Sequence, residues 1–412
     1  WGCRVGWERG GAVDETMRRE VLALDQQYVL PTYARLPLEV VAGQGAELIG
    51  PQGQRYLDFV TGLSVNNFGH CHPRVVAAIR EQAGRLIHCS NLFLTAAQAQ
   101  VAERLSALVG GGRVFFSNSG AEANECALKI ARKRSTPNGE SDVRGDVLFV
   151  ENSFHGRTIA TLSATGGPAK QAAFGLPLPH YRLVPRNDVA ALEEAFRVGP
   201  VSALIAEPVQ GESGVWPLAQ EFLATAETLC RSDDALFIMD EVQSGLGRCG
   251  AAFAYQRYGL CPDIVTVAKS LAGGLPMGAC IARGRAAEVL VAGDHGSTFA
   301  GGPVVSAAAL AVLELLAEDG LFDRVRALGA RLESWLRRLE EAGKVVDIRR
   351  LGLMVGADLA EPVAKHVVAA GIEQGILLNA TSDVTLRFLP SFVVTEDQID
   401  RVGEFLGGYL GL

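Results

Sequence analysis

Short apolar runs alternate with segments of helical spacing between about Val75 and Leu316, and this alternation restricts the possible folds more than any other feature of the chain. The pattern is typical of the α/β class, in which helices cover a parallel β-sheet. Five runs end in polar or reactive residues: Arg113 to Phe116 before Ser117, Val147 to Val150 before Glu151, Val201 to Ala206 before Glu207, Ala235 to Met239 before Asp240, and Ile264 to Ala268 before Lys269. Because ligands bind beyond the carboxyl ends of the strands in open parallel sheets, we expect these residues to converge on one site.

The two ends of the chain have different patterns. Short strand-like pieces at 46–49 and 55–59 precede the alternating region, and a helical pattern that starts at Leu321 precedes further strand-like pieces at 352–357 and 384–388. We therefore predict three parts: residues 17–73 as an N-terminal arm and part of a small domain, 74–316 as a large domain, and 317–412 as a C-terminal small α+β domain.

The composition of the chain limits the kinds of binding partner and the cellular compartment that we expect for the protein. A net charge of -8 over 412 residues argues against nucleic acid and anionic membranes as partners, because both need a basic face. The longest apolar stretch, around 304–313, is too short to span a bilayer. The eight cysteines are scattered without a CxxC pair, and the first twenty residues contain no apolar core of a secretory signal. We expect a cytoplasmic protein with free thiols.

Asp240 and Lys269 are the strongest chemical signals. Asp240 ends an apolar run that is typical of a strand buried on both faces, where a carboxylate needs a cationic partner such as a protonated pyridine nitrogen. Gln243 can then donate to the phenolate oxygen of the same ring. Lys269 follows another apolar strand, where burial lowers the pKa of an amine and makes it a nucleophile toward an aldehyde. A lysine that merely extends to solvent is the alternative.

Other residues fit an anionic aromatic ligand. Ser119, Gly120 and Ala121 lead into a helical pattern, so their backbone N–H groups can bind a phosphate, although a simple helix cap gives the same sequence. Phe154 can stack on a planar ring, or belong to the core. Two arginines, Arg157 and Arg387, offer planar forks for carboxylates, although Arg387, inside a strand of the tail, is also compatible with a solvated edge position. Together with Glu207 and Glu212 they suit recognition of an amino acid or a dicarboxylate.

Three alternative sites are weaker. The glycines of Gly245 to Gly250 match a dinucleotide motif, but they do not follow the strand directly and the carboxylates of Asp240 and Glu241 would repel a pyrophosphate. A magnesium-dependent ATPase would need a P-loop, and the sequence contains none. His70 and His72 lack a second ligand pair for zinc. We therefore predict no metal site.

Seven motifs in order resemble the class III aminotransferases, the ornithine and acetylornithine type of the fold-type I pyridoxal-phosphate enzymes. They are Gly69 to Pro73, Phe116 to Asn124, Asn152 to Thr158, Glu207 to Glu212, Asp240 to Gln243, Ala268-Lys269 and His295 to Phe299. The resemblance covers residues 38–406. It implies a large cofactor-binding domain with a mostly parallel seven-stranded sheet flanked by helices, a smaller α+β domain, and pyridoxal 5'-phosphate as cofactor.

The resemblance also implies the roles of single residues. Lys269 forms the Schiff base and shuttles the proton, Asp240 pairs with the pyridine nitrogen, Gln243 contacts the ring oxygen and Phe154 stacks on the ring. The phosphate is bound by Ser119, Gly120 and Ala121, and by Thr298 from the neighbouring subunit, which implies a homodimer with shared active sites. Substrate carboxylates are assigned to Arg157 and Arg387, with Glu212 able to pair with Arg387, and Ser297 is a further substrate-binding residue.

The implied reaction moves the ω-amino group of an acetylornithine-like donor to 2-oxoglutarate, as in arginine biosynthesis. Leu63 stands where the ornithine type carries a tyrosine, which favours an acetylornithine or 4-aminobutyrate type. Ornithine, 4-aminobutyrate, succinyl-diaminopimelate and a lysine-pathway intermediate stay open as donors. The chain departs from the family pattern at Ser213 and Trp216, and at 300–302, where Ala-Gly-Gly replaces Gly-Gly-Asn.

Overall fold

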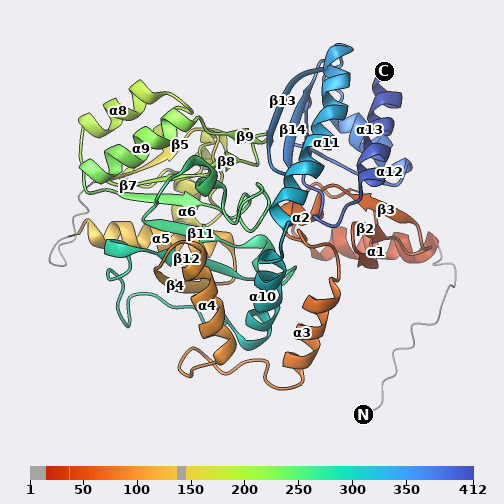
Figure 1. Cartoon of the computed structure of the whole chain (residues 1–412). Helices are drawn as coiled ribbons and strands as arrows, with labels where there is room; N and C mark the ends of the chain where they lie inside the picture. The colour runs from red at the N-terminus through yellow and green to blue at the C-terminus, as the bar shows by residue number, and fades with distance from the viewer. Residues whose placement is uncertain (1–14, 37, 137–144) are drawn as a thin grey trace.

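A seven-stranded sheet forms the centre of the larger part of the molecule (Figure 1). The computed structural model describes residues 15–36, 38–136 and 145–412. The strand order across the sheet is β4-β12-β11-β10-β7-β5-β6. The strands are β4 (Arg113–Ser117), β5 (Asp146–Val150), β6 (Tyr181–Val184), β7 (Val201–Ala206), β10 (Leu236–Asp240), β11 (Ile264–Val267) and β12 (Gly278–Ala282). All neighbours pair in parallel except β12, which is antiparallel to both β11 and β4. The predicted α/β class with a mostly parallel sheet is confirmed.

Both faces of this sheet are covered, as the apolar runs indicated. Along β7, Ala203 and Ile205 join a buried cluster with residues of helix α5 (Gly120–Arg134), whereas Leu204 and Ala206 join the cluster that contains Phe222 of α9 (Gln220–Ser232). Alternate side chains of a strand point to opposite faces, so a strand covered on both sides must be apolar throughout. The five predicted strands are all present, while β6 and β12 were not predicted.

The remaining helices surround the sheets. They are α1 (Glu15–Tyr28), α2 (Thr61–Ser64), α3 (Pro73–Ala83), α4 (Ala96–Leu108), α6 (Ile159–Ser163), α7 (Pro168–Ala172), α8 (Val189–Arg197), α10 (Pro303–Leu316), α11 (Leu321–Glu341), α12 (Ala364–Glu373) and α13 (Glu396–Leu410). Within the three described ranges, no helix is long and apolar enough to cross a membrane.

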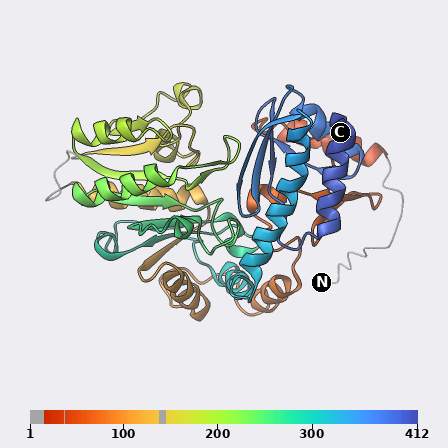
Figure 2. The ribbon, with the colours of Figure 1, turned by 45° about the horizontal axis from the view of Figure 1, so that its top comes forward.

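Segments from the two ends of the chain lie side by side (Figure 2). One four-stranded sheet joins β1 (Ala42–Gln44), β2 (Glu47–Ile49) and β3 (Arg55–Asp58) to β15 (Ile376–Leu377) through a parallel pairing of β3 with β15. A second has the order β13-β14-β17-β16, made of β13 (Val345–Leu351), β14 (Met354–Leu359), β17 (Thr385–Phe388) and β16 (Asn379–Ala380). The strands β8 (Val209–Gln210) and β9 (Trp216–Pro217) form a separate hairpin. The proposed boundaries at 73/74 and 316/317 stay predictions.

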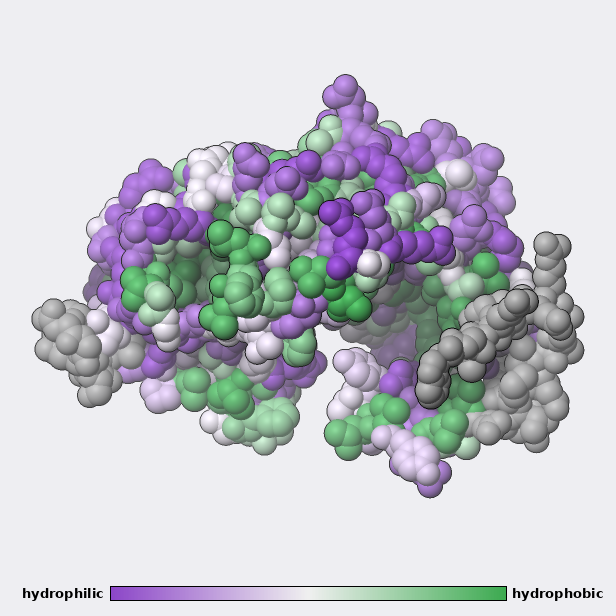
Figure 3. Space-filling model, turned by 90° about the horizontal axis from the view of Figure 1, so that it is seen from below, coloured by the Kyte–Doolittle hydropathy of each residue, from purple (hydrophilic) through white to green (hydrophobic). Residues whose placement is uncertain are grey.

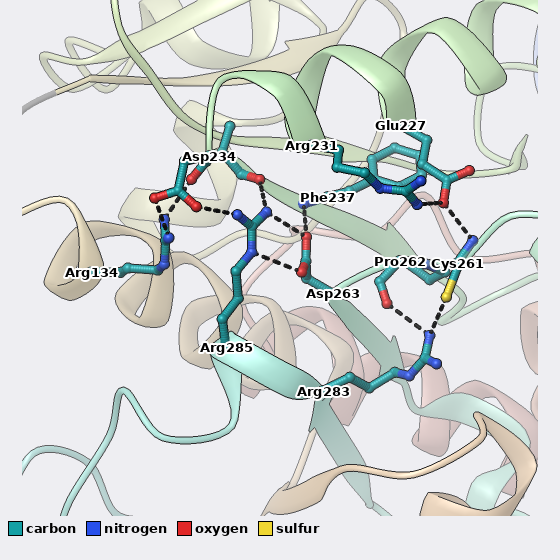
Figure 4. Close-up of polar contacts among 11 residues, drawn as sticks. Arg134, Glu227, Arg231, Asp234, Phe237, Cys261, Pro262, Asp263, Arg283 and Arg285 are labelled. Atoms are coloured by element: carbon teal, nitrogen blue, oxygen red, sulfur yellow. Dashed lines mark hydrogen bonds and ion pairs between the residues drawn. The ribbon is translucent and has the colours of Figure 1, made fainter.

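A network of charges lies at the amino ends of β10 and β11 (Figure 4). The opposite edge is the one where β10 ends in Asp240 and Lys269 follows β11. Asp263 accepts a hydrogen bond from the backbone N–H of Phe237 at 2.9 Å and two from Arg285 at 3.1 and 3.2 Å. Arg285 also binds Asp234, whose carboxylate pairs with Arg134. Asp263 thus fixes the starts of two strands.

We predict that Arg285→Met lowers the free energy of unfolding by about 1–2 kcal/mol, because the partly buried Asp263 loses a two-pronged partner. The measurement is urea unfolding. Arg197→Met is a matched control, since it removes an exposed ion pair with Glu194 and should cost less than about 0.5 kcal/mol. Equal losses in the two variants would contradict the structural role of the network.

Candidate active site

A cavity of about 420 Å³ opens at the carboxyl edge of the seven-stranded sheet. It is lined by residues from the ends of β4, β5, β7, β10 and β11, as the sequence predicted. Its predicted lining residues are Ser119, Gly120, Ala121, Phe154, Arg157, Glu212, Asp240, Gln243 and Lys269. Three predicted site residues are not among the cavity-lining residues: Arg387, Ser297 and Thr298. Of these, Arg387 forms an ion pair with Glu212, which does line the cavity.

The loop at the start of α5 has the geometry of an anion site. The Ser119 side chain caps the helix by accepting from the N–H of Glu122 at 3.2 Å. A Cβ atom at Gly120 would lie 2.7 Å from Cγ1 of Val242, so only glycine lets the helix start so close to the residues that follow β10. The helix N-terminus presents backbone N–H groups and a positive dipole end to the cavity.

Asp240 is held by two side chains that the sequence did not indicate and by one backbone N–H. Its side chain is 3% exposed. Oδ2 accepts from Nδ2 of Asn124 at 2.7 Å and lies 2.7 Å from Nδ1 of His155, while Oδ1 accepts from the N–H of Val242 at 3.0 Å. One lone pair of Oδ1 is therefore available to a donor in the cavity. Asn124 is one helical turn beyond Gly120, and His155 follows Phe154, so both stood inside predicted motifs without an assigned role.

Lys269 lies two residues after the last residue of β11 and has a left-handed backbone with φ of 48°. Burial lowers the pKa of its amine, and the nearby Arg387 guanidinium adds to the lowering, while Glu212 and the two carboxyls of Asp240 and Glu207 oppose it. A lowered pKa increases the fraction of neutral, nucleophilic amine at physiological pH. The predicted position of Lys269 at a buried strand end is confirmed.

Glu207 joins the aromatic side of the cavity to the Glu212 loop. Its Oε1 accepts from the N–H of Phe154 at 2.8 Å and its Oε2 from the N–H of Gly211 at 3.4 Å. Burial raises the pKa of this carboxyl to about 7, although the neighbouring His155 partly offsets the effect. Phe154 itself is half-buried, with Arg157 5.4 Å from its ring centroid.

Glu212 and Arg387 form the expected ion pair, at 2.7 Å. Arg387 is 2% exposed and donates further to the carbonyl of Gly211 and to Asn379, both at 2.9 Å. Nε2 of Gln243 donates to the same carboxylate oxygen of Glu212 at 3.2 Å. Burial alone would raise the pKa of Glu212, but the positive charges of Arg387 and Lys269 outweigh it and lower the pKa to about 2.

The remaining predicted residues have other surroundings. Arg157 lines the cavity and is exposed. Ser297 accepts from Nδ2 of Asn118 at 2.9 Å, next to the phosphate loop. Thr298 borders a small separate cavity together with His88 and Phe93. Among the residues that the structure describes, no group of three or more His, Cys, Asp or Glu side chains could hold a metal ion.

Comparison with known proteins identifies the same class of enzyme, the aminotransferases, that the geometry of the cavity indicates. Residues 28–408 match the family model of class III aminotransferases. The chain is 42% identical to acetylornithine aminotransferase of Caldanaerobacter subterraneus over 95% of this chain and 99% of the relative, and 43% identical to that of Methanocaldococcus jannaschii over 92% and 95%. Among solved structures, the ornithine aminotransferase of Toxoplasma gondii has a TM-score of 0.90 with 35% identity over 95% of this chain and 94% of that chain. Acetylornithine aminotransferase of Elizabethkingia anophelis has a TM-score of 0.85 with 30% identity over 95% and 98%.

The fold and the site define a fold-type I transaminase that depends on pyridoxal phosphate. The chain belongs to the class III aminotransferase family. The cavity fits this cofactor, because an anion-binding helix start, a half-buried aromatic ring, a buried carboxylate and a buried lysine surround one space. In addition, the buried Oε1 of Gln243 has no hydrogen-bond partner within the described parts of the chain.

Glu241, next to Asp240, generates a prediction about pH. Its carboxyl is 1% exposed and accepts from Ser244 and from the N–H of Tyr255, both at 2.7 Å, yet burial raises its pKa to about 7. A carboxyl whose pKa rises on folding contributes less stability as pH increases from its ordinary pKa to the folded one. Glu241→Gln removes this titration. The stability of the variant relative to wild type should therefore rise by about 1–3 kcal/mol between pH 5 and pH 8.

Urea unfolding of both proteins at the two pH values measures this difference. Other titrating groups cancel in the comparison. A difference that does not change with pH would show that Glu241 titrates normally.

Proposed function

We propose that this transaminase moves the ω-amino group of an acetylornithine-like donor to 2-oxoglutarate, giving a semialdehyde and glutamate. The observation that carries the proposal is the Glu212–Arg387 ion pair beside Lys269. A cation that can be either neutralised or exposed lets one cavity accept two kinds of substrate. The names of the relatives from Caldanaerobacter and Methanocaldococcus support the donor, as does the apolar Leu63.

The exchange at Arg387 explains the dual specificity. A donor that presents its ω-amine brings no carboxylate to Arg387, so Glu212 stays in place and neutralises the buried guanidinium. 2-Oxoglutarate or glutamate brings an α-carboxylate that replaces Glu212. Arg157, at the exposed side of the cavity, is available for the distal carboxylate of either substrate.

Other residues act on the bound cofactor and the proton. Pyridoxal phosphate, when bound, supplies an aldehyde that exchanges with amines and a ring that accepts electrons from the bond being broken. The Nζ of Lys269 would hold the cofactor through this aldehyde, and the same amine would serve as the base that takes and returns the proton. Asp240 would pair with the protonated ring nitrogen, and Asn124 and His155 orient its carboxylate. The N-terminus of α5 would bind the phosphate, and Phe154 would stack on the ring.

We also propose a homodimer with shared sites. The connection between α3 and α4 exposes Leu86, Ile87, Leu92, Phe93 and Leu94, and Thr298 and Phe299 lie nearby in the same part of the fold. Figure 3 shows apolar patches on the face that carries this connection. A partner that covers them would place Thr298 at the border between two sites. A cytoplasmic location remains part of the same proposal.

A screen of amino donors with 2-oxoglutarate, coupled to detection of glutamate, tests the substrate. N-acetylornithine should be turned over with a kcat/KM at least about tenfold above that of ornithine and 4-aminobutyrate. Succinyl-diaminopimelate is the informative competitor, because it shares the blocked α-amine. A higher value for free ornithine would favour the ornithine type instead.

We predict that borohydride fixes the cofactor to Lys269. The purified holoenzyme should absorb in the visible range, lose this absorbance on reduction, and carry a pyridoxyl group on the peptide that contains Lys269. Lys170, which lies 5.7 Å from the Phe154 ring, serves as the internal control and should remain unmodified. A label on any lysine other than Lys269 would overturn the assignment.

We predict that Glu212→Ala separates the two half-reactions. Without Glu212, Arg387 stays charged and exposed to the ω-amino donor, so kcat/KM for this donor should fall about tenfold or more, while the value for glutamate should hold or rise. Arg387→Ala should impair glutamate and 2-oxoglutarate more than the donor. Single-turnover changes of the cofactor spectrum measure each half-reaction separately. Equal damage to both by Glu212→Ala would rule out the exchange.

A further inference from the structure

Two arginines at paired positions of the β13-β14-β17 sheet donate hydrogen bonds to the loop that carries Glu212. Arg349 of β13 lies opposite Gly356 of β14, which lies opposite Arg387 of β17. Residues directly opposite on neighbouring strands point to the same face of a sheet. The two arginines therefore flank a position without a side chain.

The backbone of the loop fits into this gap. Nη1 of Arg387 donates to the carbonyl of Gly211 at 2.9 Å, and Nε of Arg349 donates to the carbonyl of Gly214 at 3.0 Å. A Cβ atom at Gly356 would meet the carbonyl oxygen of Gly214, so a side chain there would expel the loop. The carbonyls of Gly211 and Gly214, on either side of Glu212, are thus both bound by arginines of this sheet. The same sheet carries Arg387, the ion-pair partner of Glu212.

Arg349 is itself rigidly held. It is 7% exposed, donates to both carboxylate oxygens of Asp358 at 2.7 Å, and also binds Asp347. Thr385 donates to the same Asp358 carboxylate at 2.7 Å, which adds a link to β17. Burial disfavours the charged form of Arg349, but these carboxylates outweigh it and raise its pKa.

Trp216 contacts both Arg349 and the backbone of the loop. Its ring lies 3.9 Å from the guanidinium of Arg349 and 4.2 Å from that of Arg186, and its Nε1 donates to the carbonyl of Ser213 at 3.0 Å. Between these contacts, Val215 has a φ of 61°, a left-handed conformation that is strained for a β-branched residue and persists only when its surroundings enforce it.

We propose that Arg349 and Trp216 are positioning residues for the exchange at Arg387. They hold the backbone of 211–215 fixed, so that only the Glu212 side chain moves when a substrate carboxylate arrives. The inference rests on the proposed exchange between Glu212 and Arg387. It also accounts for Trp216, where the chain departs from the family pattern, because the indole supplies the surface on which Arg349 stacks.

The test compares Arg349→Met with Arg350→Met. Arg350 is the next residue on β13 and pairs with Glu333 on α11 at 2.6 Å, so its loss removes a similar ion pair without touching the loop. Arg349→Met should raise KM for the ω-amino donor about tenfold with kcat nearly kept, and leave kcat/KM for glutamate within about twofold. Arg350→Met should change neither value.

Two further measurements test the positioning role, and the first of them does not depend on catalytic turnover. Amide hydrogen exchange of residues 208–218 in the cofactor-free protein should accelerate in Arg349→Met and not in Arg350→Met. Trp216→Leu should reproduce the kinetic pattern, and Trp216→Phe, which keeps a ring for the guanidinium, should restore part of it. If Arg349→Met does not fold, the Trp216 pair of variants decides the question by itself.

The outcomes separate this inference from the proposed function. If Glu212→Ala damages both half-reactions equally, the exchange at Arg387 is wrong and the inference falls with it. If Glu212→Ala is selective for the donor but Arg349→Met and Trp216→Leu are silent or damage both half-reactions equally, only the positioning role is overturned. Unchanged exchange of residues 208–218 overturns it as well.

Discussion

The arrangement of the active site depends on one buried cation, Arg248. Its side chain is fully buried and donates to Ser64 at 3.0 Å, to the carbonyls of Leu353 and Pro390 at 3.0 and 2.6 Å, and to Asn67. Burial lowers its pKa to about 9, so it remains charged at neutral pH and needs every one of these acceptors. Because they come from three distant parts of the chain, Arg248 fixes the N-terminal and C-terminal segments to the sheet that carries Asp240 and Lys269.

The contact of Arg248 with Ser64 also fixes the backbone of a segment beside the cavity. The segment from Thr61 to Ser64 has left-handed φ at every residue, from 48° at Thr61 to 71° at Ser64. Such a run is unfavourable for residues with side chains and must be enforced by its contacts. Arg248 binds its end through Ser64, and Asp58 accepts from the N–H of Thr61 at 2.9 Å. The enforced turn brings Val65 into the cavity lining and fixes the position of the neighbouring Leu63.

The sequence predicted those parts of the site that depend on local order along the chain. Five strands were predicted from their apolar runs, and the chemistry at their ends followed because parallel strands share a carboxyl edge. Interactions between distant segments could not be predicted in this way. The Asp240–His155 contact, the pairing of β3 with β15 and the row from Arg349 to Arg387 depend on three-dimensional proximity, which one sequence does not encode locally. β12 was missed because Gly278 and the small residues after it give a weak strand signal.

The strength of the Glu212–Arg387 pair also decides which ligands can open it. Against the opposing effect of burial, Arg387, together with the charge of Lys269 and the hydrogen bond from Gln243, lowers the pKa of Glu212 from 4.5 to about 2, which corresponds to roughly 3 kcal/mol in favour of the ionised form. A neutral polar group cannot recover such a loss, because it would leave a guanidinium that is 2% exposed without a counter-charge. A second carboxylate can, since it replaces one charged acceptor with another. In the proposed exchange, the pair would therefore exclude uncharged ligands from Arg387 and admit 2-oxo acids, and a fixed loop backbone would keep the displaced carboxylate close enough to return.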